Sequence, residues 1–447
     1  MRAIAFPSTE SMGTILKLSW PIMAAMASQN LMNLVDTAMI GTLGAVPLAG
    51  VGLASIALWV MSGLLQGIGS SVQAMTARRA GEKHQDRLHE AMINAFFVIL
   101  VAGVPYAYFL WDLSSPIFRI LVQDPGVQTA GTAYLDIRLL TLPIIGLNFA
   151  FRGYFNGVQR PKVYMSTLLL MHPLNILLNY LLIFGNFGFP ALGVRGAAIG
   201  TVIATTLGCS IFALLMFAGE RARMRSLFGL VSKKAMGTLL KLAIPSGLQS
   251  LSLAGGYLVF FRIAGMVSTE ALAGVNILVN LGLIGILISM GIGLGTLTLV
   301  GNALGERDTA QARGWVRSAL LLVTLLVGSL GLILAGFPEF WLGIFIQDPK
   351  VIQVAVIPII LLGLSQSYDG AAMVLMHAHL GGGAVKTVMV VSFVTQWLVF
   401  LPACYIWVSF FNGQLVHLYI CMITYRFLLF LAFYLSIRKE RWLSIAI

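Results

Sequence analysis

The stretch "LGLIGILISMGIGLGTLTLV" (Leu281–Val300) decides the fold class, because its twenty residues carry no charge. A helix rises about 1.5 Å per residue, so about 20 apolar residues are enough to cross the hydrocarbon core of a bilayer. The whole chain of 447 residues is 58% hydrophobic and 10% charged, with a mean hydropathy of +0.91. A soluble domain carries about 25% charged residues. The sequence therefore predicts a membrane protein.

Similar apolar runs recur along the chain and predict an all-α polytopic membrane protein of twelve transmembrane helices. The predicted spans cover residues 15–40, 52–77, 91–112, 131–151, 164–185, 196–218, 239–264, 271–300, 315–337, 353–377, 388–410 and 415–437.

The lysines and arginines orient these spans. With a cytoplasmic N-terminus, the cytoplasmic side collects all but six of the 28 cations, in agreement with the positive-inside rule. The six are Arg119, Arg138, Arg195, Arg262, Lys350 and Arg426. We expect both termini to be cytoplasmic and the protein to lie in the inner or plasma membrane. The net charge of +12 then reflects short inter-span loops rather than a nucleic-acid surface.

The chain also repeats itself without gaps at one constant offset, the repeat offset, which takes Lys17 to Lys241. Each half holds six predicted spans, so the halves are parallel repeats, an arrangement that supports alternating access in transporters. We predict an N-terminal six-helix lobe (1–219), a cytoplasmic linker (220–237) and a C-terminal six-helix lobe (238–447). The repeat is carried by "KLSWP" (Lys17–Pro21) and "KLAIP" (Lys241–Pro245), by "LAGVG" (Leu48–Gly52) and "LAGVN" (Leu272–Asn276), and by "QDP" at Gln123–Pro125 and Gln347–Pro349.

Asp36 lies within the first predicted span, where a charged group costs roughly 2.5–3.5 kcal/mol and is usually functional. Gln29, Asn33 and Asp36 are spaced by four and three residues and share one helix face. Pro21 lies earlier on the same span and permits a helix bend. These residues predict a polar face that meets another helix or a wet cavity.

The fifth span repeats this pattern, because His172, Asn175 and Asn179 also share one face. Asparagine amides donate to a carboxylate and accept from its protonated form, so they suit a group whose charge changes. A lone membrane histidine is more often a packed, hydrogen-bonded residue, so His172 is left out of the predicted site.

Asp369 is the other acid well inside a span. It is either functional or the partner of Arg262 or Arg426, the arginines closest to mid-span in the second half. Weaker candidates for a substrate cavity, beside Gln29, are Asn148, Tyr257, Asn276 and Asn280.

Enzyme and ATP-binding motifs are absent from the sequence. There is no GxxxxGK[ST], HExxH or GxSxG motif. The three cysteines fall inside spans without metal-ligand spacing. We expect neither enzymatic activity, nor a cofactor, nor a resident metal.

Two six-span repeats, "NLVDTAMIGTLG" (Asn33–Gly44), "HPLNILLNYLLIFG" (His172–Gly185) and "LGVRGAAIGT" (Leu192–Thr201) together resemble the multidrug and toxic compound extrusion (MATE) family, and within it the DinF-like branch. The resemblance implies export of organic, often cationic and lipophilic compounds, driven by inward H⁺ or Na⁺. It also implies that Asp36, Asn175, Asn179 and nearby Thr201 couple the cation, with Asn33 beside them.

The resemblance leaves the coupling ion open. Relatives carry a second carboxylate at the position of Asn179, and the missing charge favours H⁺ over Na⁺ held by Asp36, Asn175 and Asn179. The NorM branch carries an acid on the seventh span, whereas Leu239–Gly265 has none. Asp369, however, lies where acids matter in that branch.

Two other functions compete with drug export. A lipid-linked precursor flippase needs several cavity cations, and the spans offer only Arg262 and Arg426. A membrane enzyme acting on lipids needs clustered His, Asp or Cys at one membrane face, which the sequence lacks. The expected partners are small-molecule drugs and membrane lipid, with no nucleic acid, and the chain is expected to be a monomer.

Overall fold

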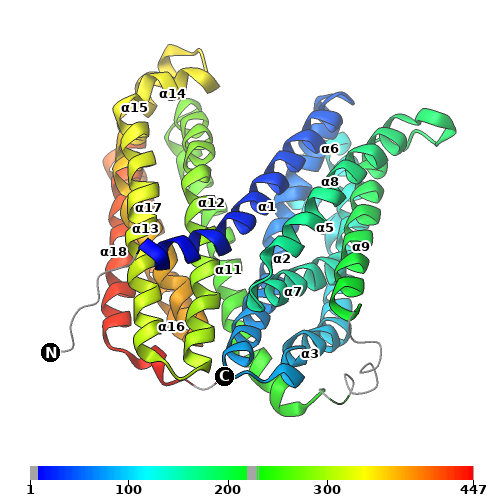
Figure 1. Cartoon of the computed structure of the whole chain (residues 1–447). Helices are drawn as coiled ribbons and strands as arrows, with labels where there is room; N and C mark the ends of the chain where they lie inside the picture. Colours follow the sequence, from blue (N-terminus) through cyan, green and yellow to red (C-terminus); the bar gives the residue numbers. More distant parts are fainter. Residues whose placement is uncertain (1–8, 219–228, 230, 446) are drawn as a thin grey trace. The chain divides into compact units, whose positions relative to one another are not determined.

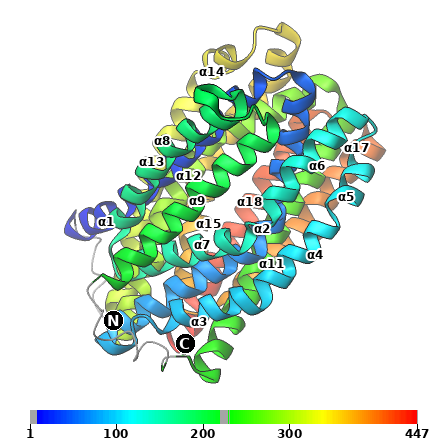
Figure 2. The same ribbon diagram turned by 90° about the vertical axis from the view of Figure 1, so that its right-hand side faces the viewer.

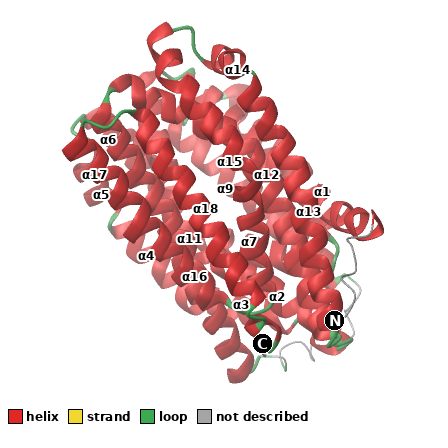
Figure 3. Cartoon of the chain, turned by 90° about the vertical axis from the view of Figure 1, so that its left-hand side faces the viewer, coloured by secondary structure: helices red, strands yellow, loops and turns green. Residues whose placement is uncertain are grey.

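The computed structural model describes residues 9–218, 229, 231–445 and 447. Every regular element in this part of the chain is a helix (Figures 1 and 3). The helices before the predicted linker are α1 (Thr9–Gly41), α2 (Ala45–Gly81), α3 (Glu90–Val98), α4 (Val104–Asp112), α5 (Ser114–Leu121), α6 (Pro125–Leu139), α7 (Leu142–Gly157), α8 (Pro161–Phe184) and α9 (Val194–Phe217).

The later helices mirror this order. They are α11 (Lys233–Val267), α12 (Thr269–Gly305), α13 (Thr309–Gly336), α14 (Pro338–Phe345), α15 (Pro349–Gly381), α16 (Val385–Phe393), α17 (Leu401–Phe411) and α18 (Leu415–Arg438). Two π-helical segments, η2 (Ile99–Gly103) and η5 (Val394–Phe400), join α3 to α4 and α16 to α17. Short 3₁₀ turns are η1 (Gln85–Arg87), η3 (Asn186–Gly188) and η6 (Arg441–Leu443).

Among the described residues, ten helical stretches are long and apolar enough to cross a membrane, and α6 with α7 forms an eleventh that is bent by 54°. Pro143 lies at the start of α7, where its missing N–H and ring favour a break. α1 is 33 residues long and covers the first predicted span, although it is not among these apolar stretches. The all-α membrane fold is confirmed, although the fourth span is bent where the sequence predicted one continuous helix.

The repeated "QDP" motif starts a helix in each half. Asp124 precedes Pro125, and its Oδ1 accepts a hydrogen bond from the Val127 N–H at 2.8 Å. Asp348 does the same at the start of α15, where its Oδ1 lies 2.9 Å from the Lys350 nitrogen. An aspartate N-cap followed by proline at the first helical position is a strong helix start.

The described chain forms two compact units. The N-terminal unit holds Ala24–Ala80 and His84–Gly247, and the C-terminal unit holds the residues up to Met23, Gly81–Lys83 and those from Leu248 onward. α1 and α11 each contribute to both units. The division between 1–219 and 238–447 stays a prediction, and residues 220–228 and 230 of the predicted linker lie outside the described residues.

Within each unit, glycine lets two helices approach at equivalent places. In the N-terminal unit a Cβ on Gly157 of α7 would lie 3.0 Å from the Gln73 carbonyl oxygen of α2. In the C-terminal unit a Cβ on Gly381 of α15 would lie 2.5 Å from the Leu297 carbonyl oxygen of α12. The repeat offset takes Gly157 to Gly381 and Gln73 to Leu297. The sequence repeat is therefore also a repeat in helix packing.

Candidate functional site

The candidate site in the N-terminal unit lies between α1 and α8. Asn179 is buried, and its Nδ2 donates a hydrogen bond of 2.7 Å to Oδ1 of the half-buried Asp36. The residue spacing on each helix brings these polar faces together, as the sequence predicts for helices with one polar face. A carboxylate therefore receives a neutral amide donor within the membrane-spanning part of the chain.

The site continues from α8 to α9, which run side by side in the N-terminal unit (Figures 1 and 2). The buried Asn175 donates through Nδ2 to the Thr201 Oγ1 at 3.5 Å, a long hydrogen bond. The Thr201 hydroxyl itself donates to the Ala197 carbonyl at 2.9 Å. Asp36 with Asn179 and Asn175 with Thr201 thus form two polar pairs, whose asparagines lie one turn apart on α8.

Asn179 keeps one hydrogen-bonding atom unused. Its Oδ1 is buried and has no hydrogen-bond partner among the described residues. Gly200 of α9 packs against this oxygen, and its missing side chain leaves room for the amide. Because unpaired buried polar atoms are costly, this carbonyl is available to accept from a protonated carboxyl or to bind a cation.

Arg138 of α6 is the charged group that acts on Asp36 electrostatically. No nitrogen of an arginine, lysine or histidine in the described chain lies within 4.0 Å of an Asp36 oxygen, so Asp36 is not held in an ion pair. The Arg138 Nε and Nη1 are buried without a hydrogen-bond partner among the described residues. Sequence reasoning missed this contribution, because Arg138 belongs to a different helix and shares no local pattern with Asp36.

The rest of the polar face of α1 is more open. Gln29 Nε2 donates to Asn33 Oδ1 at 3.2 Å, and both side chains are exposed. Nearer the start of α1, Ser28 Oγ and His172 Nδ1 lie 2.6 Å apart. His172 therefore packs as a hydrogen-bonded histidine. Pro21 is buried in the segment of α1 that belongs to the C-terminal unit.

In the C-terminal unit, Asp369 of α15 pairs with Arg426 of α18. Arg426 Nη1 lies 2.7 Å from Asp369 Oδ2, and the two side chains are only 9% and 21% exposed. Arg262, the other candidate partner, is exposed. Tyr257 of α11 also interacts with Arg426.

The remaining cavity candidates form local contacts. Asn280 Nδ2 donates to Asn276 Oδ1 at 3.1 Å, and both side chains are exposed on α12. Asn148 Nδ2 donates to the Ile144 carbonyl one turn earlier on α7 at 2.9 Å. These contacts neither bring the three asparagines together nor join them to Asp369.

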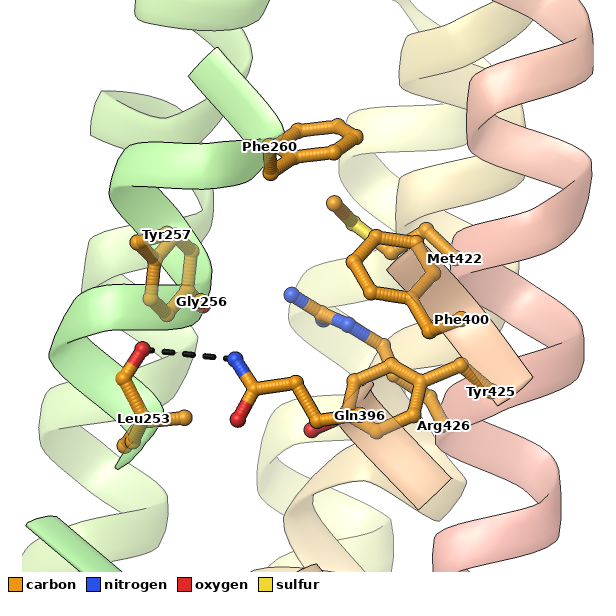
Figure 4. A pocket seen from close by; sticks show the side chains of 9 residues that line it. All are labelled: Leu253, Gly256, Tyr257, Phe260, Gln396, Phe400, Met422, Tyr425 and Arg426. Carbon is orange, nitrogen blue, oxygen red and sulfur yellow. Dashed lines mark hydrogen bonds between the residues drawn. The ribbon is translucent and has the colours of Figure 1, made fainter. Parts of the chain in front are cut away.

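Each unit contains a cavity. The one in the C-terminal unit measures about 20 Å³, room for about one water molecule. Arg426 points into it toward Tyr257, beside Gln396 of η5 (Figure 4). The cavity in the N-terminal unit measures about 460 Å³ and is lined mainly by apolar side chains of α3, α7 and α9, such as Phe96, Phe151 and Met216.

No cluster of three or more His, Cys, Asp or Glu side chains that could hold a metal occurs among the described residues. Asp36 and the residues of the two polar pairs offer a carboxylate, two amides and a hydroxyl, with Arg138 acting on Asp36 from farther away. This donor set suits a proton or a hard monovalent cation.

A protein-family model described as MatE matches the chain twice, over residues 21–181 and over residues 245–406. The two matches begin at Pro21 and at Pro245, which the repeat offset relates to each other.

Known relatives extend along nearly the whole chain. The probable multidrug resistance protein NorM of Thermotoga maritima is 28% identical over 438 residues, covering 96% of this chain and 93% of that protein. The multidrug resistance protein NorM of Burkholderia vietnamiensis is 28% identical over 419 residues, covering 89% and 87%.

Solved structures share the fold. A MATE structure in a straight conformation superposes with a TM-score of 0.87 at 19% identity, covering 96% of each chain. A MOP superfamily transporter from Pyrococcus furiosus superposes with a TM-score of 0.86 at 20% identity, covering 98% of this chain and 97% of that one.

Proposed function

The chain belongs to the MatE family, a family of membrane transporters and not of enzymes, and from this premise we propose that it exports small organic molecules by exchanging them for protons. The names of its relatives refer to multidrug resistance, which supports drugs and other lipophilic organic compounds as substrates. We place the protein in the inner or plasma membrane, with both termini cytoplasmic and no cofactor. The DinF-like branch remains part of this proposal.

The observation that carries the proposal is the 2.7 Å hydrogen bond from Asn179 to Asp36. A charge within a membrane span is costly and is therefore usually functional. This carboxylate accepts a hydrogen bond from a neutral amide, and Arg138 acts on it only from beyond ion-pair distance. It is therefore free to exchange a positive ion. Asn175, one turn earlier on α8, pairs with Thr201 of α9.

Asn179 can form a hydrogen bond with Asp36 in both of its charge states. The ionised carboxylate accepts from the Asn179 Nδ2, as in the structure. A protonated Asp36 becomes a donor, and the unpaired Asn179 Oδ1 is then the acceptor. Proton binding thus changes which end of the amide faces Asp36.

α1 links the Asp36 site to the C-terminal unit. Its residues up to Met23 belong to that unit, and its residues from Ala24 belong to the N-terminal unit. Pro21 lies two residues before this change-over and weakens the helical hydrogen-bond ladder there. We propose that protonation from outside shifts α1 against α8 and releases substrate outward. Deprotonation toward the cytoplasm restores the substrate-binding state.

The coupling ion is tested in everted membrane vesicles, in which export appears as uptake. An imposed proton gradient, acidic inside, should drive uptake of a fluorescent cationic dye, whereas a sodium gradient at constant pH should drive less than a tenth of that rate. Faster dye uptake under the sodium gradient than under the proton gradient would indicate Na⁺ coupling, the alternative mechanism. Dye uptake under neither gradient, with folded protein present, would overturn the exporter proposal.

Changing Asn179 to aspartate tests the choice of ion separately. A second carboxylate beside Asp36 adds the charge and oxygen ligands that Na⁺ prefers over a neutral amide. We expect Asn179→Asp to gain sodium-driven dye uptake of at least fivefold over the unaltered protein. Asn179→Leu, of similar size but without either polar atom, should lose uptake under both gradients. Unchanged ion preference in Asn179→Asp would contradict a coupling role for this position.

A further inference from the structure

The cavity around Arg426 occupies the place in the C-terminal unit that the Asp36 site occupies in the N-terminal unit. The repeat offset takes Asn33 to Tyr257 and Asp36 to Phe260. Tyr257 and Phe260 both line this cavity, on the same face of α11 (Figure 4). The polar face of α1 therefore has a counterpart face on α11, in which Phe260 stands at the position of the acid.

The partner helices also correspond. His172 of α8 lies 2.6 Å from Ser28 of α1, and the repeat offset takes His172 to Gln396. Gln396 Nε2 donates to the Leu253 carbonyl of α11 at 3.3 Å (Figure 4). The first helix of each repeat thus contacts the fifth span of that repeat at an equivalent level.

The charges at these two equivalent places are arranged differently. In the N-terminal unit the acid stands on the first helix and accepts from a neutral amide at 2.7 Å, while Arg138 acts on it only from beyond ion-pair distance. In the C-terminal unit the acid, Asp369, stands on α15, and Arg426 of α18 meets it at 2.7 Å. The cavity beside Arg426 measures about 20 Å³, room for about one water molecule.

We propose that Arg426 is a tethered cation that takes, beside Asp369, the place an exchanging ion takes beside Asp36. Only the N-terminal carboxylate is then free to exchange an ion, and each transport cycle carries one coupling charge. This inference deepens the proposed function and rests on its assignment of Asp36 as the coupling acid. Arg426 is a positioning residue that keeps Asp369 charged and compensated throughout the cycle.

The test measures ion binding by thermal unfolding of the purified full chain in detergent, comparing NaCl with choline chloride at constant ionic strength. All variants carry Asp36→Asn, so that any ion response reports on the C-terminal unit. With Arg426 in place, we expect the same unfolding midpoint in both salts. Adding Arg426→Gln leaves the half-buried Asp369 without a counter-charge, and the midpoint should fall by about 5 °C or more in choline chloride.

The decisive result is whether an added cation restores the unfolding midpoint. In the Asp36→Asn, Arg426→Gln variant, Na⁺ or a lower pH should restore more than half of the lost midpoint, because either cation now neutralises Asp369. Adding Asp369→Asn as well should remove this ion response. No recovery with Na⁺ or protons would show that the pair is only structural and would overturn the proposal.

A charge-preserving variant covers the case in which Arg426→Gln does not fold. Asp36→Asn, Arg426→Lys keeps a cation beside Asp369, so its midpoint should not respond to Na⁺. A Na⁺ response there, or in Asp36→Asn alone, would also overturn the proposal. Because the assay needs neither substrate nor gradient, its failure is distinguishable from failure of proton-driven export.

Discussion

Replacing Asp36 by asparagine is expected to reduce proton-driven dye uptake at least tenfold in everted vesicles. Asparagine keeps the size of the side chain. Its carbonyl oxygen can still accept from the Asn179 Nδ2, which in the unaltered protein lies 2.7 Å from the Asp36 Oδ1. It cannot gain or lose a proton. A pH difference of one unit contributes about 1.4 kcal/mol for each proton exchanged, about tenfold in a substrate concentration ratio, and this contribution disappears with the exchanging group.

The control for this variant is Asp112→Asn, which removes a carboxylate at the exposed end of α4. It should leave dye uptake unchanged, so that loss of one negative charge from the chain is not itself the cause. Both variants need the same amount of membrane-inserted protein, checked by immunoblot and by size-exclusion elution. Normal uptake by Asp36→Asn at matched expression would remove Asp36 from the coupling mechanism.

The membrane-spanning helices were predictable because each one is a local run of apolar residues in the sequence. Runs such as Leu281–Val300 identify membrane spans without any tertiary information. Breaks within spans were not predictable in this way. The π-helical segment η5 and the bend between α6 and α7 depend on hydrogen-bond register and on packing, which an apolar sequence does not encode locally.

The contact between Asp36 and Asn179 was foreseeable, because each residue lies on a polar face and few partners for such a face exist within a membrane. The partner of Asp369 was open between Arg262 and Arg426, since both lie far from it in sequence. Arg138 was missed for the same reason. The repeat offset, applied residue by residue, would have predicted that Tyr257 and Phe260 lie where Asn33 and Asp36 lie in the other unit.

Replacing Gly69 by leucine is expected to lower the yield of folded protein severely. Gly69 lies on α2 where α7 crosses it, and a Cβ there would lie 2.7 Å from the Phe149 carbonyl oxygen and 3.1 Å from the Phe149 Cβ. Because the nearest atom is backbone, α2 and α7 must separate, at a cost of about 3 kcal/mol or more. This packing positions α7 in the N-terminal unit, so its loss should affect the whole unit.

Gly52→Leu on the same helix provides the matched control, since a Cβ on Gly52 has no neighbour within 4 Å. Both substitutions raise helix propensity by a similar amount, about 1 kcal/mol, so the difference between them isolates the packing term. The comparison is made by size-exclusion elution after a heating series in detergent. Gly52→Leu should match the unaltered protein, while Gly69→Leu should aggregate or unfold at a clearly lower temperature. Equal midpoints for the two variants would mean that the contact between α2 and α7 is looser than the glycine spacing requires.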